Sequence, residues 1–530
     1  MALCLIATHP GIAAMPNLIP KPMKLEVRQG SFELTEDTVL IARPGSGQTA
    51  QELAAALRGP TGFPLPVTSK PGASRSIVLE LDRSLGAKLG PEGYRLSVGR
   101  SRVVIRAGSE AGWFYGGVTF RQLLPTEIFS PHRPARPPAN GWTAPCVEVE
   151  DTPRFPWRGL LLDPARHFMP PEFIRKLVDL MALHKLNTLQ LHLTDDQGWR
   201  LEIRKHPRLT DIGSVRKESP QRGDRNRGDG APYGPFFYTQ EQIRDLVAYA
   251  RARHVTLVPE IEMPGHFLAA LAAYPALSCT GGPFELRTRW GVEPDILCAG
   301  NDRSLEFVED VLNEVVELFP SRFIHIGGDE APRDRWKSCP KCQARMKAEG
   351  LKTEAQLQTW FNHRVEMFLA SKGRRLIGWD EILEGGLTPG AAVMSWRGTE
   401  GGIAAAEAGH DVVMSPTSHC YFDYGQAEGP GEPECIGGLI PLPKVYAFEP
   451  IPPTLPESNR SHILGAQGNI WTEFIWLPSE VEYFAFPRAT ALAEVLWSPG
   501  LGRDFDDFRR RLGGHLKRLD ECGMNYRRLD

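Results

Sequence analysis

The residues whose types and spacing most clearly suit catalysis lie at positions 323–330, which read Phe-Ile-His-Ile-Gly-Gly-Asp-Glu. The apolar first half predicts a short strand, and Gly327 and Gly328 end that strand with a sharp turn. Asp329 and Glu330 follow at its carboxyl end. Adjacent carboxylates raise each other's pKa, so an acidic pair is a costly way to make a polar turn. Acids at the carboxyl end of a strand are typical of an active site on a β/α barrel.

Such a barrel is what the rest of the chain predicts. Short apolar strand patterns recur after Trp157, and helical patterns follow them along the chain. The strands are expected at residues 158–163, 188–193, 255–260, 323–326, 375–379, 392–396, 412–415 and 463–466. Eight such units over roughly 350 residues fit a (β/α)8 TIM barrel with enlarged loops. A doubly wound open sheet is the alternative, but no glycine-rich phosphate-binding motif follows the first strand.

The region before the barrel has a different pattern. Residues 17–150 predict a small α+β domain of short strands and one helix, and the proline-rich segment 131–138 is typical of a boundary. The catalytic barrel is expected over residues 151–530, with a final helix at 505–519. Residues 1–16 contain a short apolar run without a basic start. We interpret them as a remnant of a secretory signal or as a disordered N-terminus.

Composition and net charge give no indication of a nucleic-acid-binding or membrane protein. The 530 residues are 42% hydrophobic and 24% charged, with a net charge of −3, as in a globular protein with a large core. Nothing in this balance indicates a nucleic-acid or membrane partner, and no segment has the length and hydrophobicity of a transmembrane helix. The N-terminal run favours a periplasmic or secreted location over a cytoplasmic one. The oligomeric state is left open.

The nine cysteines are an odd count, which argues against a complete disulfide framework. Cys279 and Cys298 could pair in an exported protein. Cys339 and Cys342 form an isolated C-x-x-C, which without a second pair is a weak zinc or redox signal. We expect a local disulfide or two free thiols there.

Polar and aromatic side chains gather after most of the predicted strands. They are Asp163 and Arg166; His192, Asp195 and Asp196; Glu260, Glu262 and His266; His325, Asp329 and Glu330; Trp379, Asp380 and Trp396; Tyr421 and Asp423; and Trp471 and Glu473, with Arg158 at the start of the first strand. In a barrel these strand ends meet at one mouth. Aromatic walls with carboxylate acceptors are typical of a sugar site. Single tryptophans or histidines would more often be packing residues, but the same types recur in nearly every unit.

The motifs together resemble glycoside hydrolase family 20, the β-N-acetylhexosaminidases. The matching segments are residues 157–168, 191–200, 259–266, 325–330, 378–381 and 471–473. They occur in the order of the family, and the N-terminal region is similar to the domain that precedes its barrel. Glu262 departs from the pattern, since an Asp is common there; we expect tuning of activity.

The resemblance implies a retaining exo-enzyme that removes terminal β-linked GlcNAc or GalNAc by substrate-assisted catalysis, an exception to the usual pair of catalytic carboxylates. The substrate's own acetamido oxygen attacks the anomeric carbon and gives an oxazolinium intermediate. Glu330 would be the general acid and base, and Asp329 would orient the acetamido group. Tyr421 would donate to the acetamido oxygen. No cofactor and no catalytic metal are expected.

The resemblance also implies the substrate-binding residues. The acetamido pocket would be walled by Trp379, Trp396 and Trp471; sugar hydroxyls would bind Arg158, Asp423 and Glu473; and Asp195 and His266 would set the protonation of the acid. The partners implied are oligosaccharides or glycoconjugates that contain N-acetylhexosamine.

Three other interpretations remain open from the residues. One is another acetamido-assisted glycosidase, chitinase-like or releasing lacto-N-biose. Another is a carbohydrate-binding barrel without turnover, although a lectin has no need for the Asp329–Glu330 pair. The third is a metal-dependent barrel hydrolase using His192, Asp195, His266 and His325, although the usual short metal-binding signatures are absent.

Overall fold

The computed structural model describes residues 15–529 except residues 71 and 73. Most of the N-terminal stretch 1–16, for which we expected a signal remnant or disorder, lies outside the described residues. The described chain forms two compact units: one extends to Arg154 and takes in Trp497–Met524, and the other covers Phe155–Leu496 and the residues from Asn525. The expected domain limits at residues 16 and 150 stay a prediction.

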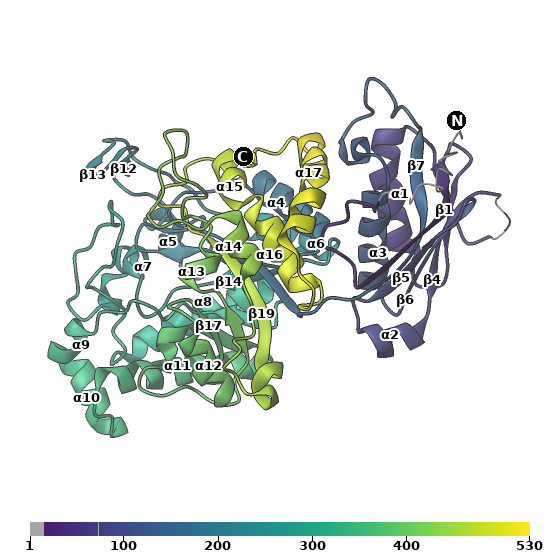
Figure 1. The fold of residues 1–530 in the computed structure, drawn as a ribbon. Helices are drawn as coiled ribbons and strands as arrows, with labels where there is room; N and C mark the ends of the chain where they lie inside the picture. Colours follow the sequence, from purple (N-terminus) through teal and green to yellow (C-terminus); the bar gives the residue numbers. More distant parts are fainter. Residues whose placement is uncertain (1–14, 71, 73, 530) are drawn as a thin grey trace, which may run out of the picture. The chain divides into compact units, whose positions relative to one another are not determined.

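The larger unit contains a closed barrel of eight parallel strands (Figure 1). The strands are β8 (Trp157–Leu162), β9 (Thr188–His192), β14 (Thr256–Glu260), β15 (Phe323–His325), β16 (Arg375–Trp379), β17 (Ala392–Ser395), β18 (Val412–Met414) and β19 (Ile463–Ile470). Pairing of β19 with β8 closes the ring. Every strand lies where the sequence predicted one, and the expected TIM barrel after a separate N-terminal domain is confirmed.

Helices follow most of the barrel strands. They are α4 (Pro171–Leu183), α6 (Gln240–Arg251), α8 (Asp302–Leu318), α11 (Glu354–Ser371), α12 (Glu400–Glu407) and α16 (Arg488–Trp497). Helix α6 begins at a capping box, in which the side chains of Thr239 and Gln242 each accept a hydrogen bond from the other's backbone N–H group. Between β16 and β17 the structure has only the 3-10 turn η3 (Asp380–Leu383). Three glycines and a proline between η3 and Ala392 disfavour a helix there.

The connections between and after the barrel strands carry further short elements. They are β10 (Thr194–Asp195), β11 (Gly198–Trp199), α5 (Arg208–Asp211), β12 (Pro220–Gln221), β13 (Asp224–Gly228), α7 (Leu268–Ala273), η2 (Pro275–Leu277), α9 (Asp334–Ser338), α10 (Pro340–Glu349), α13 (Thr417–Cys420), α14 (Leu442–Ala447), η4 (Glu457–His462) and α15 (Pro478–Ala485). Long loops of this kind are where barrel enzymes place binding residues.

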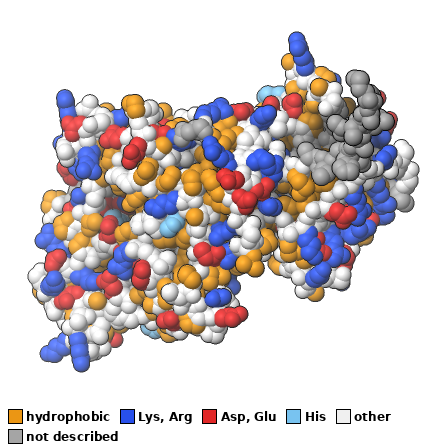
Figure 2. All heavy atoms as spheres, in the orientation of Figure 1, with side chains coloured by type: hydrophobic (Ala, Val, Ile, Leu, Met, Phe, Trp, Pro, Cys, Tyr) orange, Lys and Arg blue, Asp and Glu red, His pale blue; other side chains and the backbone are white. Residues whose placement is uncertain are grey.

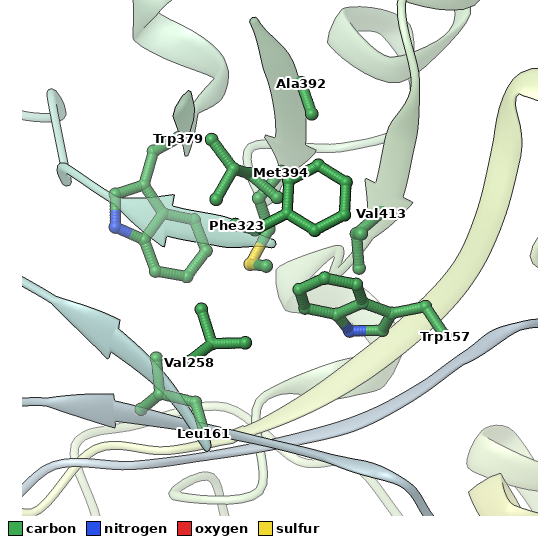
Figure 3. Close-up of a cluster of buried hydrophobic side chains, with 9 residues drawn as sticks. Trp157, Leu161, Val258, Phe323, Trp379, Ala392, Met394 and Val413 are labelled. Carbon is green, nitrogen blue, oxygen red and sulfur yellow. The ribbon is translucent and has the colours of Figure 1, made fainter. Parts of the chain in front are cut away.

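The barrel interior is filled by side chains from most of its strands (Figure 3). Trp157, Phe323, Met394 and Trp379 pack there, and Trp157 and Phe323 meet edge to face with ring centroids 5.7 Å apart. A packed interior of this type is a core rather than a channel. Because Trp379 belongs both to this core and to the mouth above it, the core fixes the position of a candidate site residue.

The smaller unit is built on a seven-stranded sheet in the order β1-β7-β5-β6-β4-β2-β3. Its strands are β1 (Lys24–Leu34), β2 (Val39–Ala42), β3 (Val67–Thr68), β4 (Ser76–Leu81), β5 (Tyr94–Val98), β6 (Arg102–Ala107) and β7 (Trp142–Asp151). Its helices are α1 (Gly47–Thr61), α2 (Arg83–Leu89), α3 (Glu110–Leu123), the turn η1 (Thr126–Phe129) and α17 (Phe505–Glu521). The single helix that the sequence predicted for this region corresponds to α3, and the predicted final helix corresponds to α17. The sequence predicted neither α1 nor α2.

The molecular surface agrees with the composition. Figure 2 shows acidic and basic side chains interspersed on the visible face, without a large patch of one sign. Among the described residues, no helix combines the length and the apolar character needed to cross a bilayer.

Candidate functional site

A cavity of about 200 Å³ lies at the carboxyl ends of the barrel strands. Polar or aromatic side chains line it, with Ile436 as the exception. The lining residues are Arg166, His192, Asp195, His266, Asp329, Glu330, Trp379, Trp396, Thr417, Tyr421, Asp423, Tyr424, Ile436, Trp471 and Glu473. Of the residues for which the family resemblance implied a role in catalysis or substrate binding, all except Arg158 line this cavity.

The turn after β15 presents the two central acids. Gly327 and Gly328 have φ values of +65° and +92°, which side chains rarely adopt. A Cβ on Gly327 would collide with the carboxylate of Glu262, so only glycine fits at this position. Glu330 itself has φ +42°, an unusual conformation for a residue with a side chain. Backbone strain of this kind clusters at functional sites.

Asp329 carries an unsatisfied acceptor. Within the described part of the chain, its buried Oδ1 has no hydrogen-bond partner. Burial, together with the charges of Glu330 and Glu260, raises the pKa of Asp329 to about 6, against the opposing charge of His266. A buried unpaired acceptor costs about 1–3 kcal/mol. A ligand N–H that reaches Oδ1 would recover part of this free energy.

Glu330 is connected to a chain of charged groups through His266. The His266 Nε2 atom lies 3.3 Å from Glu330 Oε2, and its Nδ1 lies 3.2 Å from Asp196 Oδ2 and 3.4 Å from Asp195 Oδ1. The hydrogen bond from His266 lowers the pKa of Glu330. Burial opposes the charged imidazolium, but the carboxylates of Asp195, Asp196 and Glu330 together outweigh burial and hold the pKa of His266 well above its usual value. Of these two groups, His266 therefore holds the shared proton.

His192 and Arg166 hold the other side of Asp195. His192 Nε2 and Arg166 Nη2 lie 2.9 and 2.6 Å from Asp195 Oδ2. Burial raises the pKa of Asp195, but Arg166 and His266 outweigh it and hold this pKa well below the usual range. His192 Nδ1 also lies 2.7 Å from Glu260 Oε2. Both ring nitrogens of His192 thus contact carboxylates, an arrangement that favours a protonated imidazole over a metal ligand.

Aromatic side chains form the walls. The Trp379 and Trp471 rings have centroids 5.8 Å apart, and Trp396 stacks on Tyr421 at 6.2 Å with an interplanar angle of 27°. Two indole N–H groups donate hydrogen bonds to buried carboxylates. Trp379 Nε1 donates to Glu260 Oε1 at 2.9 Å, and Trp396 Nε1 donates to Glu381 Oε2, also at 2.9 Å. Anchored aromatic faces give a rigid, largely apolar enclosure that suits a small planar group or the face of a sugar ring.

Asp423 and Glu473 supply further acceptors. Burial raises the pKa of both groups, and for Asp423 the neighbouring Glu473 adds to the effect, placing its pKa well above the usual range. In the described structure Asp423 Oδ1 is buried and has no hydrogen-bond partner. Like Asp329, it can accept a hydrogen bond from a bound ligand, here from a hydroxyl group.

The prediction that Arg158 binds the sugar is wrong, because its side chain does not line the cavity. Its buried guanidinium donates to the backbone carbonyls of Lys185 (2.7 Å) and Phe155 (2.8 Å). Arg158 is the second residue of β8, so it lies at the amino end of the strand and cannot reach the carboxyl end. The guanidinium that lines the cavity belongs to Arg166, which follows the same strand.

This correction can be tested with two matched substitutions. Arg166→Lys is expected to lower kcat/KM by about 10-fold or more, because a lysine cannot replace a guanidinium that contacts two carboxylates. Arg158→Lys should lower the thermal midpoint and leave KM close to wild type. Steady-state kinetics and thermal denaturation of both variants decide the point. A larger rise in KM for Arg158→Lys than for Arg166→Lys would contradict this assignment.

One buried acid was not among the candidate residues. Glu381 accepts the hydrogen bond from Trp396, and burial together with Asp329 raises its pKa to about 8. It lies in the motif segment 378–381, which was the only signal in the sequence that could have indicated it.

Glu262 was expected at the barrel mouth, after the third strand. Both its side-chain oxygens lack a hydrogen-bond partner among the described residues, and burial and Asp329 raise its pKa well above the usual value.

With this geometry in place, the comparisons with known proteins are informative. The family model for the catalytic domain of glycosyl hydrolase family 20 matches residues 155–500, and the model for domain 2 of that family matches residues 15–152. A β-hexosaminidase of Porphyromonas gingivalis is 46% identical over 96% of the chain, which spans 64% of that relative's length. One from Akkermansia muciniphila is 36% identical, with 81% of the chain and 85% of the relative covered.

Solved structures agree with this comparison. The β-N-acetylhexosaminidase of Streptomyces coelicolor A3(2) aligns with a TM-score of 0.84 and 32% identity, covering 97% of this chain and 99% of its own. A mutant β-hexosaminidase of Streptomyces plicatus in complex with the product GlcNAc aligns with a TM-score of 0.83 and 31% identity, covering 97% of both chains.

Proposed function

The chain belongs to glycosyl hydrolase family 20, and from this premise we propose that it is a retaining exo-β-N-acetylhexosaminidase. It removes terminal β-linked GlcNAc or GalNAc from the non-reducing ends of oligosaccharides or glycoconjugates. The observation that carries the proposal is the buried, unpaired Oδ1 of Asp329 beside Glu330, in a cavity walled by tryptophans. This acceptor fits the N–H of a 2-acetamido group.

In the first step the substrate supplies its own nucleophile. The acetamido carbonyl oxygen attacks the anomeric carbon, the glycosidic bond breaks, and the leaving oxygen takes a proton from Glu330. Asp329 accepts the acetamido N–H and stabilises the positive charge of the oxazolinium ring. Burial and the neighbouring carboxylates of Asp423 and Asp329 hold the pKa of Tyr421 well above its usual value, so its hydroxyl keeps the proton that it donates to the acetamido oxygen.

In the second step Glu330 acts as a base. It removes a proton from water, the water oxygen bonds to the anomeric carbon, and the carbon–oxygen bond of the oxazolinium ring breaks. Two inversions at the same carbon give retention of configuration. The acetamido group is regenerated, Glu330 has regained its proton, and no covalent bond to the protein is formed.

The surroundings of Glu330 favour its ionised carboxylate, which suits the second step better than the first. Its side chain is 43% exposed, so water stabilises the carboxylate that His266 also favours. A bound sugar would cover this side chain and remove the water. Desolvation raises a carboxyl pKa, so binding moves the shared proton from His266 towards Glu330. The pair can therefore deliver a proton in one step and accept one in the other.

The shape of the site supports exo-action. A cavity of about 200 Å³ with three tryptophan walls suits one sugar residue better than an extended chain. Arg166, Asp423 and Glu473 surround it with groups that bind hydroxyls. On this basis, a chito-oligosaccharide should lose single sugars from its non-reducing end. Release of disaccharides would favour a chitinase-like or lacto-N-biose-releasing enzyme.

The experiment that tests substrate assistance compares three p-nitrophenyl β-glycosides: the N-acetylglucosaminide, its N-trifluoroacetyl analogue and the plain glucoside. We expect turnover of the first, a loss of at least about 10²-fold in kcat for the second, and none for the third. Fluorine withdraws electrons from the carbonyl oxygen and weakens it as a nucleophile. Similar rates for the first two substrates, or turnover of the glucoside, would indicate a protein nucleophile. Tight GlcNAc binding without turnover would indicate a carbohydrate-binding protein.

A further inference from the structure

Four cysteine thiols meet in the larger unit, away from the residues that line the catalytic cavity. Cys279 and Cys298 lie in the long segment between η2 and α8, and Cys339 and Cys342 lie at the start of α10. Their sulfur atoms all lie within 4.8 Å of one another. Cys298, Cys339 and Cys342 are buried, and Cys279 is partly buried. The C-x-x-C that stood alone in the sequence therefore has a second pair of thiols beside it.

The spacing of the sulfur atoms identifies the kind of site. The Sγ–Sγ distances are 3.8 Å for Cys279–Cys342, 3.8 Å for Cys298–Cys339 and 3.7 Å for Cys298–Cys342. In a disulfide the sulfurs are about 2.05 Å apart. In a tetrahedral zinc tetrathiolate with Zn–S bonds of about 2.3 Å, the edge between two sulfurs is about 3.8 Å. All three distances match this edge. Of the two alternatives that the sequence left for Cys339 and Cys342, a local disulfide or two free thiols, the structure has the free thiols, and Cys279 and Cys298 are unpaired as well.

We propose that Cys279, Cys298, Cys339 and Cys342 bind one Zn²⁺ ion as a structural tetrathiolate. Binding replaces four S–H bonds by four Zn–S bonds and releases four protons, with no change of oxidation state. Four protein ligands leave no open position for water or substrate, so the ion has a structural rather than a catalytic role.

The surrounding backbone is shaped for such a site. Cys339 is the N-cap residue of α10 and Cys342 lies in its first turn, so the positive end of the helix dipole faces the negatively charged tetrathiolate. Gly300 passes so close to the backbone of Lys341 and Cys342 that a Cβ at this position would collide with it. The absence of a side chain at Gly300 thus lets the segment with Cys298 approach the helix start.

The zinc ion would link the loop that carries His266 to the loop that carries Glu330. The segment with Cys298 is tied to the loop after β14, because Leu297 N–H donates to Pro264 O at 2.9 Å, two residues before His266. The same Leu297 accepts a hydrogen bond from Trp336 Nε1 at 3.0 Å, in the segment between Glu330 and Cys339. The metal therefore crosslinks the loop of His266 to the loop of Glu330 and supports the 3.3 Å contact between them.

The test measures metal and thiols in the purified full-length chain, so it does not depend on the proposed enzymatic function. Elemental analysis by mass spectrometry is expected to find about one zinc per chain, and titration under denaturing conditions should find all the cysteines reduced. Cys342→Ser should lose the zinc. Cys146→Ser, which replaces a buried cysteine outside the cluster, should keep it.

A second measurement covers the case in which Cys342→Ser does not fold. Stepwise reaction of the wild-type thiols with an organomercurial should release zinc, detected with a chelating dye, as the four cluster thiols react. Reconstitution of the metal-free chain with Co²⁺ should give the thiolate-to-cobalt charge-transfer band of a tetrahedral sulfur site. Iron in place of zinc, two disulfides with four thiols missing, or reduced thiols without bound metal would each overturn the proposal.

Discussion

Asp329→Asn is expected to lower kcat on a β-N-acetylglucosaminide by about 10²–10³-fold, the range typical of removing one group that stabilises developing charge. The asparagine side chain has nearly the same shape but no negative charge to place against the oxazolinium ring. Its amide group can also present N–H where the acetamido N–H must be accepted. Steady-state kinetics measure the loss, and Asp334→Asn, an exposed acid on α9, serves as the control. Near-wild-type turnover of Asp329→Asn would exclude the role.

The same substitution should change the pH profile. Asp329 acts as a carboxylate, and its pKa is raised to about 6. In the wild type, kcat/KM should therefore fall as the pH is lowered through about 6, because protonation removes the charge. In Asp329→Asn this acidic limb should disappear. If the limb persists unchanged, another group of the charged network controls it.

Asp329→Asn should be more stable than the wild type although it is less active. The folded-state pKa of Asp329, about 6, lies above its usual value of 3.8, so the ionised carboxylate costs stability progressively as the pH rises from about 4 to about 6, and the full cost applies at neutral pH. Each pKa unit corresponds to about 1.4 kcal/mol, so removing this charge should raise the free energy of unfolding at pH 7 by about 1–3 kcal/mol. Thermal denaturation of the variant tests this expectation.

Glu330→Gln should show a loss that depends on the leaving group. A glutamine cannot donate the proton that a sugar leaving group needs, so hydrolysis of chitobiose should fall by about 10²–10⁴-fold. A dinitrophenolate leaves without protonation, so formation of the intermediate from a dinitrophenyl substrate should suffer far less. Pre-steady-state release of the phenolate separates this step from the later attack of water, for which Glu330 is the base.

An equal loss with good and poor leaving groups would leave the leaving-group dependence like that of the wild type. This outcome would contradict general acid catalysis by Glu330. Glu241→Gln, which changes an exposed acid at the start of α6, controls for the general effect of removing a surface charge.

The relation between sequence and structure differs from one part of the protein to another. The barrel strands were predictable because burial on both faces requires short continuous apolar runs, which are local features of the sequence. The missing helix after β16 and the unexpected α1 and α2 show the limits of periodicity in segments that contain glycine or proline. Most of the candidate site followed from one rule, since residues after parallel strands share one mouth.

The sequence by itself determined the strand ends, the acidic pair and the family motifs, since each is set by neighbouring residues. Only the tertiary structure decided which end of the barrel each side chain occupies, and this separated Arg158 from Arg166. The structure also decided the pKa values, because burial and the contacts of Asp329, His266 and Glu330 join distant segments. The thiol cluster is of the same kind: Cys279 and Cys342 are 63 residues apart in the chain, and folding alone brings their sulfurs to 3.8 Å.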